Sequence, residues 1–545
     1  MKALTDADQK FAALYQTRYS WWVHWRELAE FILPRRYQWL VTPNQANRGA
    51  QLNQNIIDST GTIAARTCAA GLMAGITSPS RPWFKLRLSG FNAGDTSNPV
   101  SLWLNEVESR MMKVFAESNF YQSLAVMYFD LTVFGTAAQI IYEDRENVIH
   151  CYNPCLGEFY LGNNDRLEVE HFYREFTMNI TQMAQRFGKA AMPEALQALL
   201  DQPGNSQTEF KVRHCVEPNT GESLVSKRFP YREYYWVVGH TNKPLLAKGF
   251  FEFPVNAPRW DTVGNDAYGR GPGMDALPDI KQLQQEQKRK AQALDKMVNP
   301  PMVADVQLKN QPASLLPGGI TYVAGTNNAG FKPVFQINPP FQELMLDIKE
   351  VQERVKTVFF NDLFLMISQL DTVRSATEID ARREEKLVML GPVLERLESE
   401  LLSPAITRTF NIMSRGGLLP PAPQEIANMP IEITYISMLA EAQRIASTSG
   451  MERLVATVGN MAGIQPDVID NIDLDEFVSE YGSLLRVNPK IVRDREQVAS
   501  MREQRNAQKQ AQEGMQMAGG AVEGAKLLSE TDVGGGQNAL SMMLQ

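Results

Sequence analysis

The residue types best suited to bind a metal lie in the middle of the chain: His150, Cys151, Cys155, His214 and Cys215. Zinc prefers thiolate and imidazole ligands, and its sites usually combine two closely spaced pairs. Only Cys151 and Cys155 are spaced in this way, so the pattern favours cysteines buried in a sheet. We predict no metal ion and no cofactor, with a zinc site where strands converge as the alternative.

Two glycine-rich segments imitate nucleotide-binding loops. Residues 325–332 (Gly-Thr-Asn-Asn-Ala-Gly-Phe-Lys) lack the Gly-Lys-Ser/Thr ending through which a phosphate loop holds phosphates and magnesium. Phe331 separates the glycine from the lysine, and Pro333 replaces the hydroxyl residue. The second segment, residues 269–273, lacks the GxGxxG spacing of a dinucleotide site. We therefore predict turns at both places and no nucleotide site.

Patterns for general acid–base or nucleophilic catalysis are absent from the sequence. It contains five histidines, and neither a nucleophile elbow nor an HExxH pattern. The carboxylate pairs Glu384–Glu385 and Asp475–Glu476 fit solvated faces better than a catalytic dyad. We predict that the chain is not an enzyme and has no catalytic residues.

The composition is that of an ordinary soluble protein with two or more structural regions. The chain has 545 residues, of which 44% are hydrophobic and 21% charged. Its formal net charge is −8, whereas a protein that grips DNA by its phosphates carries a basic patch or stripe. We expect at most local or loose contact with nucleic acid. Four cysteines in so long a chain predict folding in a reducing compartment.

The sequence predicts neither a signal peptide nor a membrane span. The first residues, Met-Lys-Ala-Leu-Thr-Asp-Ala-Asp, have no apolar core of the kind that secretion requires. The segment closest to a membrane span, residues 355–370, contains Lys356, Asn361, Asp362 and Gln369. We expect no insertion into a membrane.

Residues 268–410 contain the pattern around which the chain is organised, two long helices separated by a proline-rich excursion. The second helix has an apolar residue at every third or fourth position: Phe341, Leu344, Ile348, Val351, Val355 and Val358. The first helix has a weaker stripe interrupted by glutamines: Leu277, Ile280, Leu283, Ala291, Leu294 and Val298. Helices of this size are about 35 Å long, too long for one subunit to bury both of their faces. We predict that neighbouring copies cover them in the wall of a ring.

Helices and strands are also predicted before and after this pair. Four helices precede it, at residues 5–33, 54–74, 100–118 and 120–134. Residues 137–263 shift to a period of two, which predicts an inserted, mostly antiparallel β region with short helices at 181–187 and 193–200. After the pair, Ser375 and Glu378 form a capping box that opens a helix running to about Leu402. Gly391-Pro392 predicts a kink in that helix.

The order of several motifs resembles the portal, or head-to-tail connector, proteins of short-tailed bacteriophages. The motifs are Asn55-Ile-Ile-Asp58-Ser-Thr, residues 69–84, Tyr268-Gly-Arg-Gly-Pro-Gly, Val298-Asn-Pro-Pro and Thr377-Glu378-Ile. The likeness covers most of residues 10–480. It implies a mainly helical α+β, portal-type fold with a wing, a long-helix stem, a small clip and a helical crown or barrel, assembled into a ring.

The resemblance also implies a division of the chain. The expected regions are a wing (1–265, with the inserted β region), a first stem helix (266–297), a clip (298–340), a second stem helix (341–365), a tunnel loop (366–376), a long kinked helix returning to the wing (377–435), a crown with a C-terminal helical barrel (436–513) and a flexible tail (514–545).

The function implied by the resemblance is that of a viral portal protein. Twelve copies would form a ring at one capsid vertex of the virion, assembled in the host cytoplasm. Double-stranded DNA would pass through the ring, without sequence specificity, during packaging and ejection. The expected partners are further copies of the chain, the major capsid protein, scaffolding protein, the terminase packaging motor and head–tail adaptor or tail proteins, with no membrane. The alternative is another virion structural protein, such as a tail-tube or internal core protein, without a DNA channel.

The residues expected to meet these partners follow from the same division. A channel that lets DNA pass must not neutralise many phosphates, because each contact strengthens binding. The candidates for DNA contact are Arg374, Lys356, Lys288, Arg289 and Lys290. Pairing within a helix or between subunits is the alternative role of these cations. The residues expected to face the motor or adaptor are Asn299, Pro300, Pro301, Asn327 and Asn328.

Overall fold

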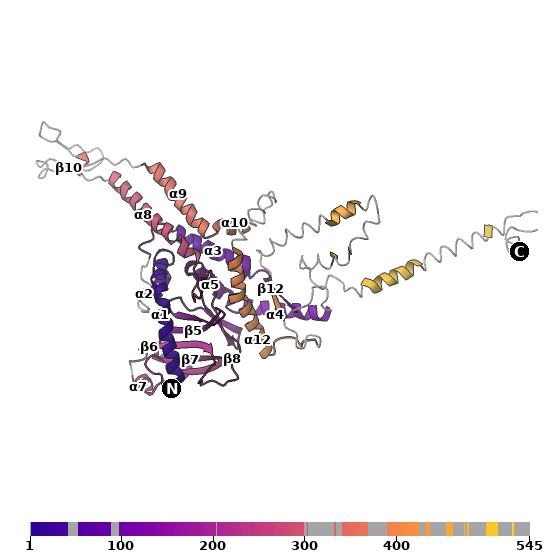
Figure 1. Cartoon of the computed structure of the whole chain (residues 1–545), viewed down its shortest axis with the longest axis horizontal. Coiled ribbons are helices and arrows are strands. Elements are labelled where there is room, and N and C mark those ends of the chain that lie inside the picture. Colours follow the sequence, from indigo (N-terminus) through magenta and orange to yellow (C-terminus); the bar gives the residue numbers. More distant parts are fainter. Residues whose placement is uncertain are drawn as a thin grey trace, which may run out of the picture. The chain divides into compact units, whose positions relative to one another are not determined.

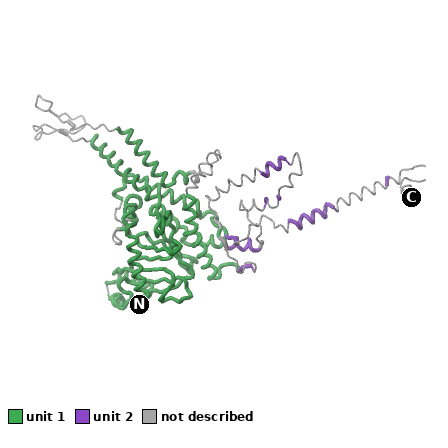
Figure 2. The backbone as a smooth tube through the Cα atoms, in the orientation of Figure 1, with its two compact units in different colours: residues 1–85, 108–420, 433–441 green, residues 86–107, 421–432, 442–545 purple. Residues whose placement is uncertain are grey.

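The structure is a computed structural model that describes residues 2–41, 53–88, 98–202, 204–298, 302–303, 332–333, 340–368, 390–423, 431–435, 454–461, 473–474, 477–478, 498–510 and 526–527. The chain divides into two compact units (Figure 2). Unit 1 comprises residues 1–85, 108–420 and 433–441, and unit 2 comprises residues 86–107, 421–432 and 442–545.

Helices dominate the described chain (Figure 1). The α-helices are α1 (Lys2–Phe31), α2 (Pro34–Val41), α3 (Thr60–Ile76), α4 (Asn98–Glu117), α5 (Phe120–Phe134), α6 (Ile180–Phe187), α7 (Glu194–Leu200), α8 (Pro272–Val298), α9 (Phe341–Val358), α10 (Asn361–Ser368) and α12 (Ser403–Arg415). The structure also contains a 3₁₀ turn, η2 (Lys189–Ala191), and a π-helical turn, η4 (Glu398–Leu402).

Short strands make up the rest of the regular structure. They are β1 (Phe84–Leu88), β2 (Gln139–Asp144), β3 (Val148–Tyr152), β4 (Phe159–Asn163), β5 (Val169–Asn179), β6 (Glu209–Pro218), β7 (Tyr231–Val237), β8 (Leu246–Phe250), β9 (Val255–Asn256), β10 (Met302–Val303), β11 (Lys332–Pro333) and β12 (Ile431–Tyr435). The predicted mainly helical α+β class is confirmed.

The predicted β region is confirmed as antiparallel. Strands β4 to β8 form a five-stranded sheet in chain order, and β3, β2 and β9 form a smaller one. Alternation along β7 places Tyr234 and Trp236 on one face and Tyr235 and Val237 on the other. The first pair packs against Phe11 and neighbouring residues of α1, and the second pair packs against α6 and α7. The large sheet is therefore covered by helices on both faces.

The N-terminal helix was predicted almost to its ends, and of its three tryptophans Trp25 lies in the core while Trp21 and Trp22 are half-buried. Trp25 is fully buried, stacks with Trp21 at 6.1 Å between ring centroids, and meets the ring of Tyr268 edge-on at 5.1 Å. The helix α1 ends before Pro34, and that proline starts α2, where its missing N–H costs nothing.

The helix rich in small residues, predicted over residues 54–74, begins later, at Thr60. The Oδ1 atom of Asp58 accepts a hydrogen bond from the backbone N–H of Thr60 at 2.8 Å, which fixes the start of α3. The small residues of this helix let neighbouring helices pack closely against it. A Cβ atom added to Gly61 would lie 2.7 Å from Cδ1 of Ile280, and one added to Gly71 would lie 2.1 Å from Cγ of Phe364.

The glycines of the 269–273 segment allow two backbones to cross in direct contact. Gly135 ends α5 with a φ of 72°, in the left-handed region. A Cβ added to Gly269 would lie 2.4 Å from the carbonyl oxygen of Gly135, and one added to Gly273 would lie 2.3 Å from that of Val133. These glycines serve the close packing of residues 269–273 against the end of α5 rather than the binding of a nucleotide, and the segment leads directly into α8.

The two long helices lie side by side and antiparallel (Figure 1), and we call α8 and α9 the rod pair. Leu283, Ile348 and Val351 form a buried cluster between them, and Leu344 packs against it. Farther along α8, Leu294 is 44% exposed and Val298 is 85% exposed. Within one chain, the predicted apolar stripe is thus buried near the body of unit 1 and bare toward its outer end.

The prediction of one continuous second rod through residue 365 is wrong. The helix α9 ends at Val358, Phe360 adopts a φ of 55°, and α10 begins at Asn361. Phe359 is fully buried, and Phe364 of α10 packs against Gly71 of α3. Burial of these two rings turns the chain at a place where no proline or glycine signals a break.

The helix predicted to end near Leu402 continues to Arg415, so that boundary is wrong. The chain is helical from residue 390, widens into the π-helical turn η4, and continues as α12. Glu400 in η4 accepts hydrogen bonds from Nη2 of Arg259 at 2.6 Å and from the backbone N–H of Arg259 at 2.8 Å. The hydrogen bonds from this buried arginine stabilise the π-helical turn, and nothing in the sequence near Glu400 predicts such a turn. The predicted capping box, Ser375 to Glu378, and the chain before the predicted kink lie outside the described residues.

Unit 2 contributes two further described helices, at residues 454–461 and 498–510. Side chains 499–510 are exposed throughout, as is usual for a helix with polar residues on every side. In the proline-rich excursion between the rods, β10 and β11 pair antiparallel, with Met302 opposite Pro333. Among the described helices, none is both long and apolar enough to cross a membrane.

Candidate functional site

The side chain of Asp58 joins both rods to the start of α3. Its Oδ2 atom accepts a hydrogen bond from Nε2 of Gln287 on α8 at 2.9 Å and another from Nε2 of Gln352 on α9 at 2.8 Å. Its Oδ1 atom receives the Thr60 N–H already described. One carboxylate therefore connects three helices of unit 1.

Gln284, one turn before Gln287 on α8, binds the backbone around Asp58. Its Oε1 atom accepts hydrogen bonds from the backbone N–H groups of Ile57 at 2.7 Å and Asp58 at 2.8 Å, and its Nε2 atom donates to the carbonyl oxygen of Asp58 at 2.9 Å. The side chain is 5% exposed. We refer to Asp58, Gln284, Gln287 and Gln352 as the Asp58 clamp.

The clamp holds a charged carboxylate at neutral pH. Burial alone would raise the pKa of Asp58, but the hydrogen bonds from Thr60, Gln352 and Gln287 outweigh it and keep that pKa below its ordinary value. A carboxylate only accepts hydrogen bonds, and every group facing this one is a donor. The arrangement positions helices and offers no proton for catalysis.

Ion pairs add a second set of links at the base of the rod pair. Nζ of Lys281 lies 2.7 Å from Oε2 of Glu27 on α1, and Nη2 of Arg354 on α9 lies 3.2 Å from Oδ1 of Asp279 on α8. These side chains are partly exposed, so each pair contributes only about 0.2–1 kcal/mol. They fix the register of the rods more than they stabilise the fold.

Four of the five residues predicted to contact DNA lie on the rods, and they do not form a single cluster. Lys356 is paired with Glu353 at 2.8 Å within α9, the alternative role predicted for it. Nζ of Lys290 lies 3.9 Å from the sulfur of Met345. Lys288 and Arg289 are exposed, and neither forms an ion pair with another described residue. Arg374 lies outside the described part of the chain.

The residues predicted to face a motor or adaptor, Asn299, Pro300, Pro301, Asn327 and Asn328, also fall outside the described residues. The two short strands β10 and β11 are the described part of that excursion. The assignment of these five residues therefore stays a prediction.

The cysteines and histidines proposed as an alternative zinc site do not form one. Within the described residues, which include all four cysteines, no group of three or more metal-binding side chains occurs. The Nδ1 atom of His214 accepts from Nε of Arg174 at 3.0 Å, and Nε2 lies 2.9 Å from Oε1 of Glu233. Both ring nitrogens are thus occupied by protein groups, while His150 is exposed.

The glutamines of the clamp were missed at the sequence level. Gln284 and Gln287 interrupt the apolar stripe of α8, which suggests that they face solvent. Gln352 lies between Val351 and Val355, two apolar positions of α9. Their partner, Asp58, is more than 200 residues away in sequence. The available signal was the interruption itself, because a polar residue in an otherwise buried stripe requires a hydrogen-bond partner.

Comparison with known proteins agrees with this architecture. A family described as bacteriophage head to tail connecting protein matches residues 4–492. The chain is 41% identical over 530 residues to the portal protein of Salmonella phage epsilon15, covering 96% of this chain and 95% of that protein. It is 39% identical over 539 residues to the probable portal protein of Bordetella phage BPP-1, covering 98% and 96%.

The match extends over nearly the whole chain and includes the rod pair, the clamp and the sheets. It is a match to structural connectors rather than to enzymes, in agreement with the prediction that the chain has no catalytic role. The resemblance noted from the sequence motifs is confirmed: this chain belongs to the bacteriophage head-to-tail connecting proteins, the family that includes these phage portal proteins.

Proposed function

We propose that copies of this chain assemble into a ring of twelve at one capsid vertex and that double-stranded DNA passes through the ring during packaging and ejection. The observation that carries the proposal is the near full-length similarity to phage portal proteins. The rod pair supports it, because its outer apolar residues are bare in a single chain and need neighbours to cover them.

The charge of the chain suits a passage for DNA. Its net charge is −8, and each phosphate neutralised by a lysine or arginine would strengthen binding through counterion release. A lumen with few cations lets a duplex slide, whereas a basic lumen would hold it. Arg374, in the expected tunnel loop (366–376), is our leading candidate for the DNA-contacting residue.

The regions and partners of the proposed ring follow the division given above. The rods would form the stem, residues 298–340 the clip that meets the packaging motor and later the tail, and residues 436–513 the crown inside the capsid. The ring would also contact the major capsid protein and scaffolding protein during assembly in the host cytoplasm.

Electron microscopy of the purified full-length chain in negative stain tests the ring. We expect annular particles with a central hole and a native mass about twelve times 61.3 kDa. Fibres would instead support a tail-tube protein, and closed shells or compact single copies would support an internal core protein. Either result would overturn the proposal.

The proposed role of Arg374 has a separate test in filled phage heads. We expect Arg374→Ala to lower the fraction of heads that retain DNA, with the exposed Lys227 changed to alanine as the control. Equal retention in both variants and the parent would remove Arg374 from the DNA path and leave the ring itself untouched.

A further inference from the structure

The side of α8 that is turned away from α9 is basic. Leu283 and Lys290, seven residues apart, mark the side that contacts α9. Residues two positions later lie about 200° around a helix, on the opposite side. That opposite side carries Gln285, Lys288, Arg289, Gln292 and Lys296, all of them exposed. We call these five residues the basic edge; Asp295 is the exposed acidic residue beside them, and the half-buried Glu286 accepts a hydrogen bond from Gln282.

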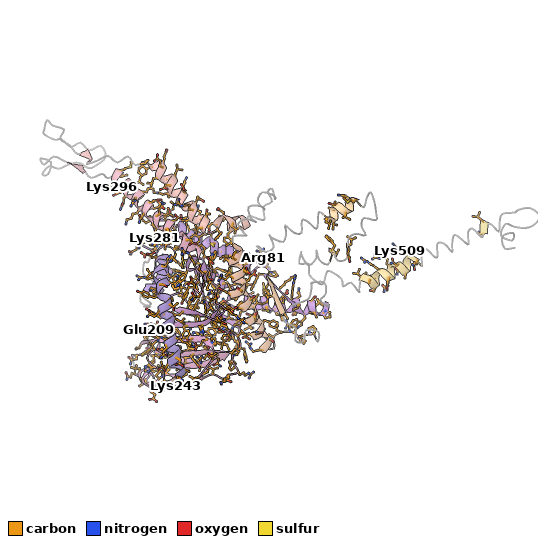
Figure 3. The ribbon with its side chains drawn as sticks, viewed as in Figure 1. Arg81, Glu209, Lys243, Lys281, Lys296 and Lys509 are labelled. Carbon is orange, nitrogen blue, oxygen red and sulfur yellow. The ribbon has the colours of Figure 1, made fainter. Side chains whose placement is uncertain are left out.

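The cations of the basic edge form no ion pair within the part of their own chain that the structure describes. Lys281, on the same side of α8 but nearer the body of unit 1, pairs with Glu27 of α1. Beyond the reach of α1, Lys288, Arg289 and Lys296 form no ion pair with any described acid. Figure 3 shows Lys281 nearer the body of unit 1 and Lys296 near the outer end of this helix.

The side of α9 that is turned away from α8 is acidic. Ile348 and Val355, seven residues apart, are buried on the inner side. Residues two positions before and after them lie on the outer side. The outer side carries Glu343, Leu346, Glu350, Glu353 and Thr357, all exposed, and we call these the acidic edge. Leu346 is 66% exposed, and Lys349, Arg354 and Lys356 lie on the margin of this edge. Within α9, Arg354 pairs with Glu350 at 3.4 Å and Lys356 pairs with Glu353 at 2.8 Å. These pairs are largely exposed, so they neutralise the edge only in part.

The two edges lie at the same level along the rod pair. Lys290 of α8 is beside Met345 of α9, so the segment that carries the basic edge runs alongside the segment that carries the acidic edge. One rod pair therefore presents opposite charges on its two outer sides. Two unlike, complementary surfaces on one molecule form a head-to-tail contact, which repeats from copy to copy and closes into a ring when the rotation allows.

We infer that the basic edge of α8 binds the acidic edge of α9 in the next copy of this chain. The inference rests on the proposed ring and names the surfaces that build it. It assigns Lys288 and Arg289 to the contact between copies instead of to DNA. In a closed ring each rod pair has a neighbour on both sides, so both edges and the exposed Leu346 become covered.

Charge reversal tests the inference with full-length chains. The first variant carries Lys288→Glu, Arg289→Glu and Lys296→Glu, and the second carries Glu343→Lys, Glu350→Lys and Glu353→Lys. Each variant alone brings like charges together at every contact. We expect each to raise the subunit concentration needed for ring formation at least tenfold, measured by mass photometry at low salt.

Mixing the two variants gives the decisive result. In a one-to-one mixture with alternating copies, every contact again joins a basic edge to an acidic edge, so we expect rings to return. A chain that carries all six substitutions should also assemble alone. The control is Lys227→Glu with Arg228→Glu, in the exposed loop before β7, which should assemble like the parent.

Three outcomes would overturn the inference. The single variants could assemble like the parent, the mixture could fail to restore rings, or the first variant could form normal rings whose heads lose DNA, which would return these cations to the DNA path. If the triple variants lose their helical circular dichroism, the pair Arg289→Glu and Glu350→Lys carries the same mixing test. Failure of the unaltered chain to form rings would instead contradict the proposed function.

Discussion

At the scale of single residues, Asp58 makes more contacts between helices than any of the cations predicted to contact DNA. Its carboxylate is the common acceptor for Gln287 and Gln352, and its backbone is held by Gln284. Loss of the carboxylate would leave two amide groups without a partner in a partly buried site. The free energy of such a loss is about 1–3 kcal/mol.

We expect Asp58→Ala to lower the stability of the protein by about 1–3 kcal/mol, read from the midpoint of urea unfolding at fixed subunit concentration. Asp165→Ala, in an exposed turn, is the control and should lie within about 0.5 kcal/mol of the parent. An unchanged midpoint for Asp58→Ala would show that the clamp contributes nothing to stability.

Gln352→Glu gives a pH-dependent version of the same test. The new carboxyl group would face the Asp58 carboxylate, so its pKa in the folded state would rise above the unfolded value. The loss of stability caused by Gln352→Glu should therefore be present at neutral pH and diminish as the pH falls toward 5. Comparison of the variant with the parent at each pH removes the effects of other groups. A penalty that does not change with pH would contradict this account.

His214 makes the fold sensitive to mild acid. Burial lowers its pKa to about 4, against the effect of its bond to Glu233, and its ring stacks on Tyr235 at 4.1 Å. Because Nδ1 accepts from Arg174, the neutral ring carries its proton on Nε2 and donates it to Glu233. The nearby charged Arg174 and Arg186 also disfavour a positive ring.

The sign of the pH effect follows from this lowered pKa. Between about pH 6.5 and 4, His214 is protonated in the unfolded chain but stays neutral in the folded chain. Stability should fall between pH 6.5 and about 4, in total by on the order of 3 kcal/mol. We expect His214→Asn to flatten the pH dependence of the unfolding midpoint in this window. An identical slope in parent and variant would assign the effect to other groups.

At the scale of elements, the small residues of α3 are required by the helices that touch it. Gly71 leaves room for the ring of Phe364 on α10, and Gly61 leaves room for Ile280 on α8. We expect Gly71→Ala to destabilise the protein by about 1–3 kcal/mol, because the added methyl group would overlap the Phe364 ring.

Gly391 is the matched control for this substitution. It lies in a helix with nothing within 4 Å of an added Cβ, so Gly391→Ala should be neutral or stabilise by up to about 1 kcal/mol. Thermal unfolding of both variants under one condition separates the two expectations. Equal melting temperatures would mean that α10 can move aside at little cost.

The sequence predicts helices and strands well where the pattern is local. The period of α9 and the alternation in the β region both correspond to observed elements. The break at Phe360 and the wide turn at Glu400 were not predicted, because distant residues cause them: Gly71 receives Phe364, and Arg259 binds Glu400. The clamp was missed for the same reason, since a glutamine looks the same in sequence whether water or Asp58 faces it.

At the scale of the whole molecule, all four cysteines are buried in unit 1. Burial raises the pKa values of Cys68, Cys151 and Cys155 to about 12, and that of Cys215 well above its ordinary value. These thiols remain protonated and inaccessible to solvent in the folded protein.

We expect Ellman's reagent at pH 8 to label none of the four cysteines rapidly in the native protein and all four in guanidinium chloride. Ser80→Cys, at an exposed position, provides a positive control that should react at once. A fast-reacting native thiol would reveal opening of unit 1 around that cysteine.

The bare outer end of the rod pair affects how the protein has to be made. A single copy leaves Val298 and Leu346 with 85% and 66% of their surfaces in water. Copies produced faster than they find correct neighbours will adhere to unrelated chains instead. Yield should therefore depend on the rate of translation, and slow expression should recover more usable material than a strong promoter.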